Sequence, residues 1–456
     1  MAKKNDPAVL VEYDRIIKEL NDRTGENRIS PSLSRIVAIL DYLDNPHLAY
    51  KVIHIAGTNG KTTTSRMIES LLRAAGLNTG LTISPHLQDL RERIQINGAP
   101  IDIEEFVETY HELKPIVDLV EENLGQKISF FEFMTAMAFT SFASSAVDVA
   151  VIEVGMGGTW DATNLVVPSV CVITPIDLDH QQFLGNTITE IAGEKAGIIK
   201  SDTVVVSARQ HPDAETVLRN NAKECGVEIT FRGDDFGVES RMSAVGGQVL
   251  TLRGHYAAYE NLLLPLFGEH QAENASLALA AIEKFFGVSQ ERPQISSDLL
   301  LEGFGSVTSP GRLEIIQRNP TVLIDVAHNP HGARALRKAL LSEFDFQYLV
   351  MIIAMFKDKD IEGFFQNMQG VVDYIIITNI GHERSASIQD IKEVVSRHFS
   401  DTPIESIESL PDAYTRAVEL VDEFELSEYM GTGILVTGSV YTVGAARTLL
   451  KRVSGT

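Results

Sequence analysis

Cysteine is nearly absent from this chain of 456 residues, which contains only Cys171 and Cys225. Two cysteines cannot form a disulfide framework, and their spacing is not that of a structural zinc site. Cys171 stands inside an apolar run and is interpreted as a core residue. The fold must therefore depend on buried apolar surface, and for this length we expect two domains, with three as the alternative.

Long apolar runs and positive charge are also scarce. No stretch approaches 18 apolar residues, and the N-terminal segment lacks the apolar run of a signal peptide, so we expect neither a membrane span nor secretion. Lys and Arg number 39 against 62 Asp and Glu, giving a formal net charge of −23. This excess argues against nucleic acid or an anionic membrane as a partner. The expected location is cytoplasmic, and a polyanionic substrate would need a local positive site.

Residues 52–64, VIHIAGTNGKTTT, are the most informative segment. A β-branched run, a glycine-rich turn, Lys-Thr and a helical pattern follow one another, which is the context of a phosphate-binding loop. Gly57 and Gly60 let backbone N–H groups approach an anion, and Lys61 adds positive charge. The usual spacing would put glycine at Ile55, so the alternative is a glycine-rich turn that only happens to precede a lysine.

Apolar runs interleaved with helical patterns indicate a parallel sheet covered on both faces. In the first part of the chain these runs are Val52–Ala56, Thr79–Ser84, Asp148–Val154, Ser169–Ile176 and Thr203–Ser207. Residues 228–267 instead carry short β-like stretches and glycine turns, typical of a small antiparallel excursion.

A second unit is indicated beyond residues 303–311, which have the composition of a linker. Four further strand candidates follow it: Val322–Ala327, Tyr348–Met355, Tyr374–Thr378 and Ile434–Gly438. The predicted fold class is therefore α/β. A P-loop domain with a mainly parallel sheet flanked by helices (1–304) is joined by a linker (305–311) to a smaller Rossmann-like α/β domain (312–456).

Polar motifs stand at the carboxyl ends of the predicted strands, where open α/β sheets bind ligands. Ser84 and Glu153 close two strands, His180 follows a third, and Lys195 lies on the next helix. A carboxylate, a hydroxyl and an imidazole near phosphates suit Mg²⁺, although His180 could instead hold an outer-shell water because Mg²⁺ prefers oxygen. Each residue alone also has a purely structural interpretation, so this hypothesis requires the three strand ends to meet on one face.

The second unit has its own polar motifs. Arg312 follows a Pro-Gly turn, and Asp325 ends the first strand of this unit in DVAHNP. If the two units face each other, both residues would reach the nucleotide from the opposite wall. Taken alone, the two motifs are a turn and a helix start.

Twelve short motifs, in this order, make the chain similar to the folylpolyglutamate synthase/dihydrofolate synthase family of the Mur ligase superfamily over essentially its full length. They are GTNGKT (57–62), SPHL (84–87), ERI (92–94), FFEFMTAMAF (130–139), EVGMGG…DATN (153–164), DLDH (177–180), IAGEKAGIIK (191–200), GEHQAENA (268–275), PGRLE (310–314), DVAHNPHGA (325–333), KDKD (357–360) and TGSVYTVG (437–444).

The resemblance implies an ATP-dependent, ADP-forming acid–amino-acid ligase of folate biosynthesis. ATP would phosphorylate a carboxylate of dihydropteroate or a reduced folate, and the α-amine of L-glutamate would attack the acyl phosphate. A phosphate loop with Mg²⁺ suits the first step, which needs mostly positioning and charge neutralisation. A second domain that closes would keep water from the acyl phosphate.

Carried over by motif position, the resemblance also implies roles for particular residues. Catalytic roles fall on Lys61, Lys195, His180 and His328, and metal ligation falls on Ser84, Glu153 and His180. ATP contacts fall on Gly57, Thr58, Asn59, Gly60, Lys61, Thr62, Asn274, Arg312 and Asp325, and pterin contacts on Ser129, Phe130, Phe131, Glu132 and Trp160. Lys195 would be carbamylated. Two bound Mg²⁺ ions and a monomeric protein are separate expectations.

Two departures from the family pattern and two rival functions stay open. Thr62-Thr63 replaces the usual Gly-Ser, which leaves open which hydroxyl meets the metal, and Thr159 replaces a frequent arginine.

A peptidoglycan-precursor ligase would use the same chemistry, but only about fifty residues precede Val52, too few for a UDP-binding domain. A non-catalytic nucleotide switch would leave Glu153 and Lys195 without a role. The sequence does not distinguish dihydrofolate synthase from folylpolyglutamate synthase activity.

Overall fold

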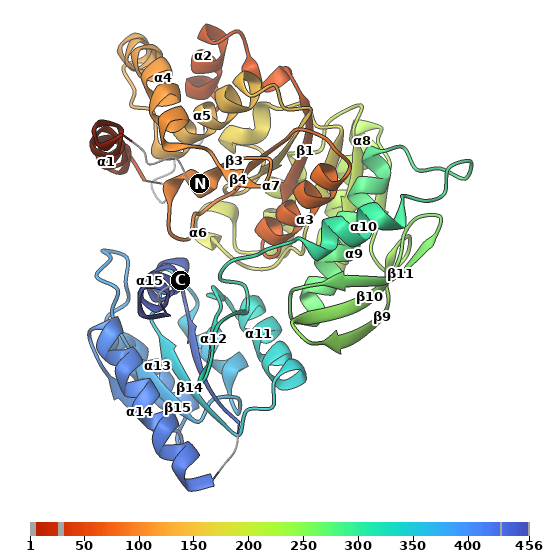
Figure 1. Ribbon diagram of the computed structural model, residues 1–456. Coiled ribbons are helices and arrows are strands. Elements are labelled where there is room, and N and C mark those ends of the chain that lie inside the picture. Colours follow the sequence, from red (N-terminus) through yellow and green to blue (C-terminus); the bar gives the residue numbers. More distant parts are fainter. Residues whose placement is uncertain (1–5, 26–31, 429–430, 455–456) are drawn as a thin grey trace. The chain divides into compact units, whose positions relative to one another are not determined.

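The computed structural model describes residues 6–25, 32–428 and 431–454 (Figure 1). It divides into two compact units. Unit 1 comprises Met1–Ser240, Leu250–Leu263 and Glu273–Val307, and unit 2 comprises Arg241–Val249, Leu264–Ala272 and Thr308–Thr456. The chain passes from unit 1 to unit 2 for the last time between Val307 and Thr308, inside the segment predicted as a linker. Within the described residues, no helix combines the length and the apolar character needed to cross a membrane.

Unit 1 is built on an eight-stranded sheet with the order β4-β3-β2-β5-β1-β6-β7-β8. The strands are β1 (Lys51–Ala56), β2 (Thr79–Thr82), β3 (Ile94–Ile96), β4 (Ala99–Pro100), β5 (Val149–Glu153), β6 (Val170–Ile173), β7 (Val204–Ser207) and β8 (Ile229–Phe231). Neighbours from β2 to β8 pair in parallel, whereas β3 and β4 are added antiparallel at one edge. The mainly parallel sheet is thus confirmed.

Helices cover both faces of this sheet. They are α1 (Pro7–Asn21), α2 (Ser34–Tyr42), α3 (Lys61–Ala74), α4 (Ile103–Leu124), α5 (Phe130–Ser144), α6 (Gln181–Leu184), α7 (Ile188–Ala196), α8 (Pro212–Cys225), α9 (Glu269–Phe285) and α10 (Ser297–Gly305), with short 3-10 turns η1 (Pro46–Leu48), η2 (Leu90–Arg93) and η3 (Ala162–Leu165). Helix α3 contacts β1, β2 and β5, and α10 packs on α3. Helices α2, α4 and α5 pack with side chains from the other face of β1 and β5.

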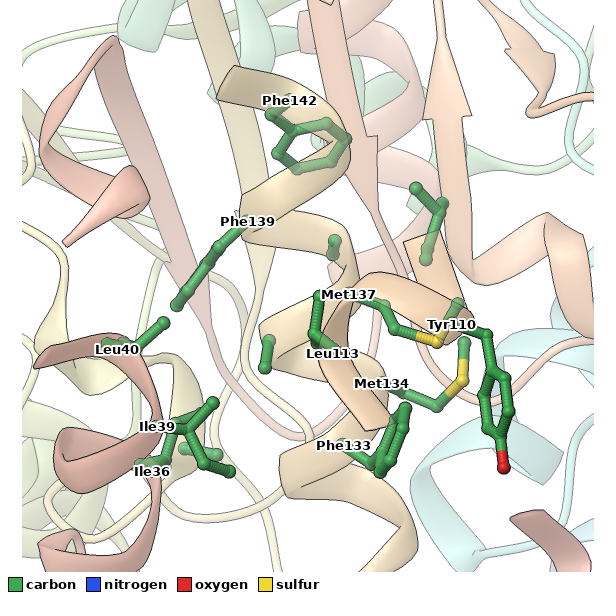
Figure 2. Close-up of a cluster of buried hydrophobic side chains, with 14 of the residues drawn as sticks. Ile36, Ile39, Leu40, Tyr110, Leu113, Phe133, Met134, Met137, Phe139 and Phe142 are labelled. Atoms are coloured by element: carbon green, nitrogen blue, oxygen red, sulfur yellow. The ribbon is translucent and has the colours of Figure 1, made fainter. Parts of the chain in front are cut away.

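The cluster between α2, α4 and α5 forms a large part of the core of unit 1 (Figure 2). Phe133, Met137 and Phe139 of α5 are fully buried, as is Tyr110 of α4. Helix α5 is apolar nearly all round, which is the pattern of a helix enclosed by other elements. Its first turn is thereby fixed beside the sheet.

Residues 228–267 differ in part from the prediction. The expected excursion exists as a three-stranded sheet, β11-β10-β9, made of β9 (Gly237–Ala244), β10 (Gly247–Arg253) and β11 (Ala258–Leu264). Its short connections require antiparallel neighbours. The first predicted stretch, however, is β8, which pairs in parallel with β7 as the edge of the main sheet.

Unit 2 contains a six-stranded sheet with the order β12-β13-β17-β14-β15-β16. Its strands are β12 (Glu314–Arg318), β13 (Thr321–Ile324), β14 (Tyr348–Ile353), β15 (Tyr374–Ile377), β16 (Ile404–Ser406) and β17 (Thr432–Thr437), and its helices are α11 (Pro330–Glu343), α12 (Ile361–Met368), α13 (Ile388–His398), α14 (Leu410–Glu428) and α15 (Val440–Ser454). All pairs are parallel except β12 with β13. The predicted second α/β unit is confirmed, with β12 and β16 added at its edges.

Candidate active site

The loop after β1 has the geometry of an anion cradle. Gly60 precedes the first residue of α3 with a φ of 87°, a left-handed conformation that favours glycine. Neither loop glycine has room for a side chain. A Cβ on Gly57 would lie 1.8 Å from Thr174 Oγ1, and one on Gly60 would lie 2.7 Å from Asn274 Oδ1. The side chain of Asn274 in α9 therefore lies against the loop, and its contact with ATP stays a prediction.

The same loop is held by the end of strand β6. The N–H groups of Thr58 and Asn59 donate to Pro175 O at 2.9 and 3.3 Å. The Thr58 hydroxyl donates to Asp177 O at 3.0 Å. These bonds hold the loop against the neighbouring strand end.

Two lysines converge on this loop. Lys61 Nζ donates to Gly57 O at 3.0 Å and to Thr58 O at 3.3 Å. Lys195 Nζ, from α7, donates to the same Gly57 oxygen at 2.8 Å. Lys195 is only 4% exposed. Burial, and next the charge of Lys61, lowers its pKa from 10.5 to about 7.

Glu153 is the buried carboxylate of the site. It ends β5, between β1 and β2 in the sheet, and is 2% exposed. It accepts a hydrogen bond from Thr62 Oγ1 at 3.0 Å and one from the Ser84 N–H at 3.4 Å. Thr62, Glu153 and Ser84, from three segments, thus lie close together, and the Thr62 hydroxyl contacts the carboxylate.

His180 lies on the loop after β6, at the start of α6, with a φ of 51°. Its N–H donates to Asp179 Oδ1 at 2.8 Å, and its Nε2 is 3.9 Å from the same oxygen. Asp179 in turn lies close enough to Lys195 to act on its pKa, opposing the effect of burial. Across the described ranges, no three His, Cys, Asp or Glu side chains are placed to hold a metal ion together.

The glycine-rich turn 155–158 is pressed between three elements. A Cβ on Gly155 would lie 2.4 Å from the Phe131 ring, and one on Gly157 would lie 3.2 Å from the Trp160 ring. A Cβ on Gly158 would lie 2.4 Å from the backbone oxygen of residue 194, next to Lys195. The turn therefore links the first turn of α5 and the half-buried Trp160 to α7.

The other predicted pterin residues have structural partners. Ser129 caps α5, and Glu132 completes a capping box with it. Glu132 also pairs with Arg35 of α2 at 2.9 Å, with both side chains buried. Phe130 is 7% exposed. These residues hold the start of α5 in place, and their role toward a ligand stays a prediction.

A buried network that the sequence reading missed supports this turn. Asp161 accepts hydrogen bonds from the N–H groups of Met156 and Thr163, both at 2.9 Å, and from Thr163 Oγ1 at 2.5 Å. Thr163 Oγ1 also lies 2.9 Å from His54 Nε2. Burial lowers the pKa of His54 to about 3, so the ring is neutral. The DATN motif contained Asp161 and Thr163, but nothing in the sequence connected them to a histidine in β1.

In unit 2, Arg312, Asp325 and His328 come together. Asp325 accepts the N–H groups of Leu313 and Ala327, both at 2.8 Å. Burial raises the pKa of Asp325, and the charges of Arg312 and His328 oppose this effect. His328 Nδ1 lies 2.8 Å from Val326 O. These three residues belong to the motifs PGRLE (310–314) and DVAHNPHGA (325–333), which the sequence analysis assigned to this unit.

His270 is a further residue of unit 2 that the sequence reading left without a role. Burial, and next the charges of His331 and Arg312, lowers its pKa to about 4. The ring is therefore neutral near pH 7. Its only sequence signal was its position in the GEHQAENA motif.

Comparison with known proteins agrees with this geometry. Residues 55–282 match the Mur ligase middle domain, and residues 311–440 match the Mur ligase, glutamate ligase domain. The dihydrofolate synthase/folylpolyglutamate synthase of Mycobacterium tuberculosis is 45% identical over 452 residues, which cover 95% of this chain and 93% of the relative. That of Bacillus subtilis is 31% identical, with 93% and 96% covered.

Solved structures agree as well. The Mycobacterium tuberculosis folylpolyglutamate synthase complexed with ADP matches with a TM-score of 0.93 at 44% identity, covering 97% of this chain and 99% of that one. Escherichia coli FolC in complex with DHPP and ADP matches with a TM-score of 0.82 at 28% identity, covering 97% and 98%. The chain therefore belongs to the Mur ligase family and, within it, to the dihydrofolate synthase/folylpolyglutamate synthases, which are ATP-dependent ligases.

Proposed function

We propose that this protein joins L-glutamate to dihydropteroate, to a reduced folate, or to both, through an acyl phosphate formed with ATP. The observation that supports this proposal most directly is that four side chains lie around one glycine-rich loop: Lys61, Lys195, Glu153 and Asn274. Chemistry of this kind needs a positioned triphosphate next to a carboxylate acceptor. Family membership supplies the substrate class, because the matching relatives are folate enzymes over nearly their full length.

The ATP phosphates would lie on loop 57–62. The first turn of α3 offers the positive end of a helix to an anion. Lys61 would exchange its present bonds to Gly57 and Thr58 for the β- and γ-phosphate oxygens, because its ammonium already lies on the loop. Asn274 would contact the nucleotide, and Arg312 and Asp325 are proposed to contact it from unit 2.

The donor set at Glu153 fits a magnesium ion, and we propose that two such ions bind. The carboxylate and the hydroxyls of Thr62 and Ser84 are oxygen ligands, and Mg²⁺ completes its shell with phosphate oxygens and water. A dedicated all-protein cage is not needed, because Mg²⁺ usually keeps several waters. His180 would hold a bound water. When bound, Mg²⁺ neutralises charge on the transferred phosphoryl group.

Lys195 is proposed to carry a carbamate. Carbon dioxide reacts with a neutral amine, and a lysine with a pKa of about 7 is largely neutral at physiological pH. The product would replace a buried positive charge beside Lys61 with a negative one, turning a repulsion into an attraction. It would also bring two oxygen acceptors toward the magnesium site.

The pterin ring is proposed to bind near the turn 155–158, between Phe131 and Trp160. Both aromatic rings contact this turn and are only partly buried. Flat aromatic faces bind a pterin ring at low conformational cost. Ser129, Phe130 and Glu132 would hold the start of α5 that presents Phe131.

One assay tests the proposal and its rival. ATP-dependent phosphate release should require glutamate and either dihydropteroate or a reduced folate, and comparing the two pterins assigns the activity. A UDP-muropeptide with its amino acid is the control for a peptidoglycan-precursor ligase. Phosphate release with the muropeptide but with neither pterin would overturn the proposed function.

A further inference from the structure

The peptide unit between Pro175 and Ile176, just after β6, holds loop 57–62 of unit 1. Its carbonyl oxygen accepts the N–H groups of Thr58 and Asn59 at 2.9 and 3.3 Å. In a planar trans peptide the N–H points away from the C=O, so the Ile176 N–H points away from the loop. A group that binds this N–H therefore also sets the direction in which the carbonyl oxygen points.

The side-chain amide of Gln210, on the loop after β7, binds this N–H. Its Oε1 accepts the Ile176 N–H at 3.0 Å. Its Nε2 donates to Thr174 O at 3.1 Å. The amide thus spans Pro175, with one hydrogen bond to the residue before it and one to the residue after it, and it fixes the backbone on both sides.

The orientation of the Gln210 amide is determined by its partners. A backbone N–H only donates and a carbonyl oxygen only accepts, so Oε1 must face Ile176 and Nε2 must face Thr174. Nε2 also donates to Ser207 Oγ at 3.1 Å, and this hydroxyl donates to Ala208 O at 2.9 Å. A flipped amide would place donor against donor and acceptor against acceptor, so only one arrangement satisfies the amide.

A second pair of bonds joins the same strand end to loop 57–62. Thr58 Oγ1 donates to Asp177 O at 3.0 Å and accepts the Asp177 N–H at 3.1 Å. Thr174 Oγ1 occupies the space beside Gly57, 1.8 Å from the position that a Cβ would take there. The loop is therefore shaped against the end of β6, and Gln210 holds that strand end in place.

We propose that Gln210 is a positioning residue for nucleotide binding, which acts on loop 57–62 through the carbonyl oxygen of Pro175. This inference rests on the proposed function, in which the loop receives the ATP phosphates. Without the amide, the 175–176 peptide could rotate, and the loop would adopt shapes that misplace Lys61, the first residue of α3. Part of the binding energy of the nucleotide would then be spent on ordering the loop.

Gln210→Leu tests this role because leucine keeps a similar volume and removes all three hydrogen bonds of the amide. We expect the Kd of ADP with Mg²⁺, measured by titration calorimetry, to rise about tenfold, because a backbone N–H loses its partner. The KM for ATP should rise in parallel, whereas kcat should stay within about threefold because the lost bonds order the loop before phosphoryl transfer. The KM for the pterin substrate at saturating ATP should stay within about twofold.

Gln210→Glu is the second variant, and it replaces Gln210→Leu if that protein does not fold. It keeps an acceptor for the Ile176 N–H but places an oxygen against Thr174 O, so ADP binding should weaken here too. Gln290→Leu is the matched control. Gln290 is an exposed glutamine of unit 1, and its variant should bind ADP as the wild type does.

The outcomes separate positioning from a purely structural role. An unchanged Kd for ADP in both Gln210 variants would overturn the inference. An equal loss of affinity for ADP and for the pterin substrate, with a lower urea midpoint, would also overturn it, because Gln210 would then serve the fold alone. A wild-type protein that binds no ADP would instead reject loop 57–62 as the nucleotide site, and with it the proposed function.

Discussion

Lys195 should make the protein less stable than it would be without this side chain. Its ammonium is buried beside Lys61 and shares the Gly57 oxygen with it. The nearby carboxylates, of which Asp179 acts most strongly, do not offset the effect of burial on this charge. A buried charge that is not fully compensated is unfavourable, and such groups are found where function requires them. Replacing Lys195 by methionine keeps a similar volume and removes the charge.

The size of the effect follows from the lowered pKa of Lys195, about 7 in the folded protein against 10.5 in the unfolded chain. One pKa unit is worth about 1.4 kcal/mol, so the protonated amine costs the folded state about 5 kcal/mol below pH 7. Between pH 7 and 10.5 only the unfolded chain keeps this proton, so the penalty shrinks as pH rises, to about 2 kcal/mol at pH 9.

Lys195→Met should therefore raise the free energy of unfolding most at low pH. The variant also loses the hydrogen bond to Gly57 O, which is worth about 1 kcal/mol. The expected net gain is about 4 kcal/mol at pH 6 and about 1 kcal/mol at pH 9. Ligase activity should be lost at both pH values, because neither an ammonium nor a carbamate can form.

Urea unfolding at pH 6 and pH 9, in buffer free of carbon dioxide and nucleotide, measures this difference. Trp160 is the only tryptophan and reports on unit 1, which also contains Lys195. The control is Lys223→Met on α8, an exposed lysine, whose effect should stay within about 0.5 kcal/mol at either pH. A gain for Lys195→Met that is absent, or that does not decrease with pH, would refute the reasoning.

Three further predictions concern the same site. Lys61→Ala should lower turnover by about 10²–10³ without loss of the fold, and more than about a tenth of the wild-type rate would contradict the phosphate-loop assignment. Glu153→Gln should raise the Mg²⁺ concentration required for half-maximal rate far more than the pterin KM, and equal effects on both would exclude it as a metal ligand. The emission of Trp160 should change on adding dihydropteroate, saturating near its KM, and should change less with ATP. If the emission does not change when dihydropteroate is added while the enzyme turns it over, Trp160 has only a structural role.

The central strands of both sheets could be predicted because they are buried on both faces. β1, β5 and β14 are near-continuous apolar runs bounded by glycine or polar residues. Strand order along the chain then placed Ser84 and Glu153 at one edge of one sheet, and the contact at 3.4 Å agrees. For elements of this kind, composition alone carries most of the information.

The edge strands could not be predicted from composition because their side chains are half exposed. β12 and β16 contain no buried residue, and β4 consists of two exposed residues. Such strands form because a neighbouring strand offers unpaired backbone groups. The same limit applies to residues 241–249 and 264–272, which group with unit 2 although they are interrupted by segments of unit 1.

Residue types and their spacing singled out most residues of the candidate site, but they did not predict the protonation states of those residues. Motif position singled out Lys195, whereas its lowered pKa follows from burial and from Lys61, which is distant in sequence. The neutral state of His54 likewise follows from its burial and next from the charge of Lys200, which is distant in sequence. Charge state follows from three-dimensional environment, so it becomes accessible only once the strands are assembled.

Two features near loop 57–60 depart from ordinary stability rules, and they support the functional assignment. Two lysines share one carbonyl oxygen, and the carboxylate Glu153 is buried close by. Each feature is unfavourable in isolation, and a sequence selected only for stability would remove them. Bound phosphates and cations would relieve these features together, because a polyanion pairs with the lysines and a cation pairs with the carboxylate. Ligand binding should thus stabilise unit 1 more than any single contact suggests.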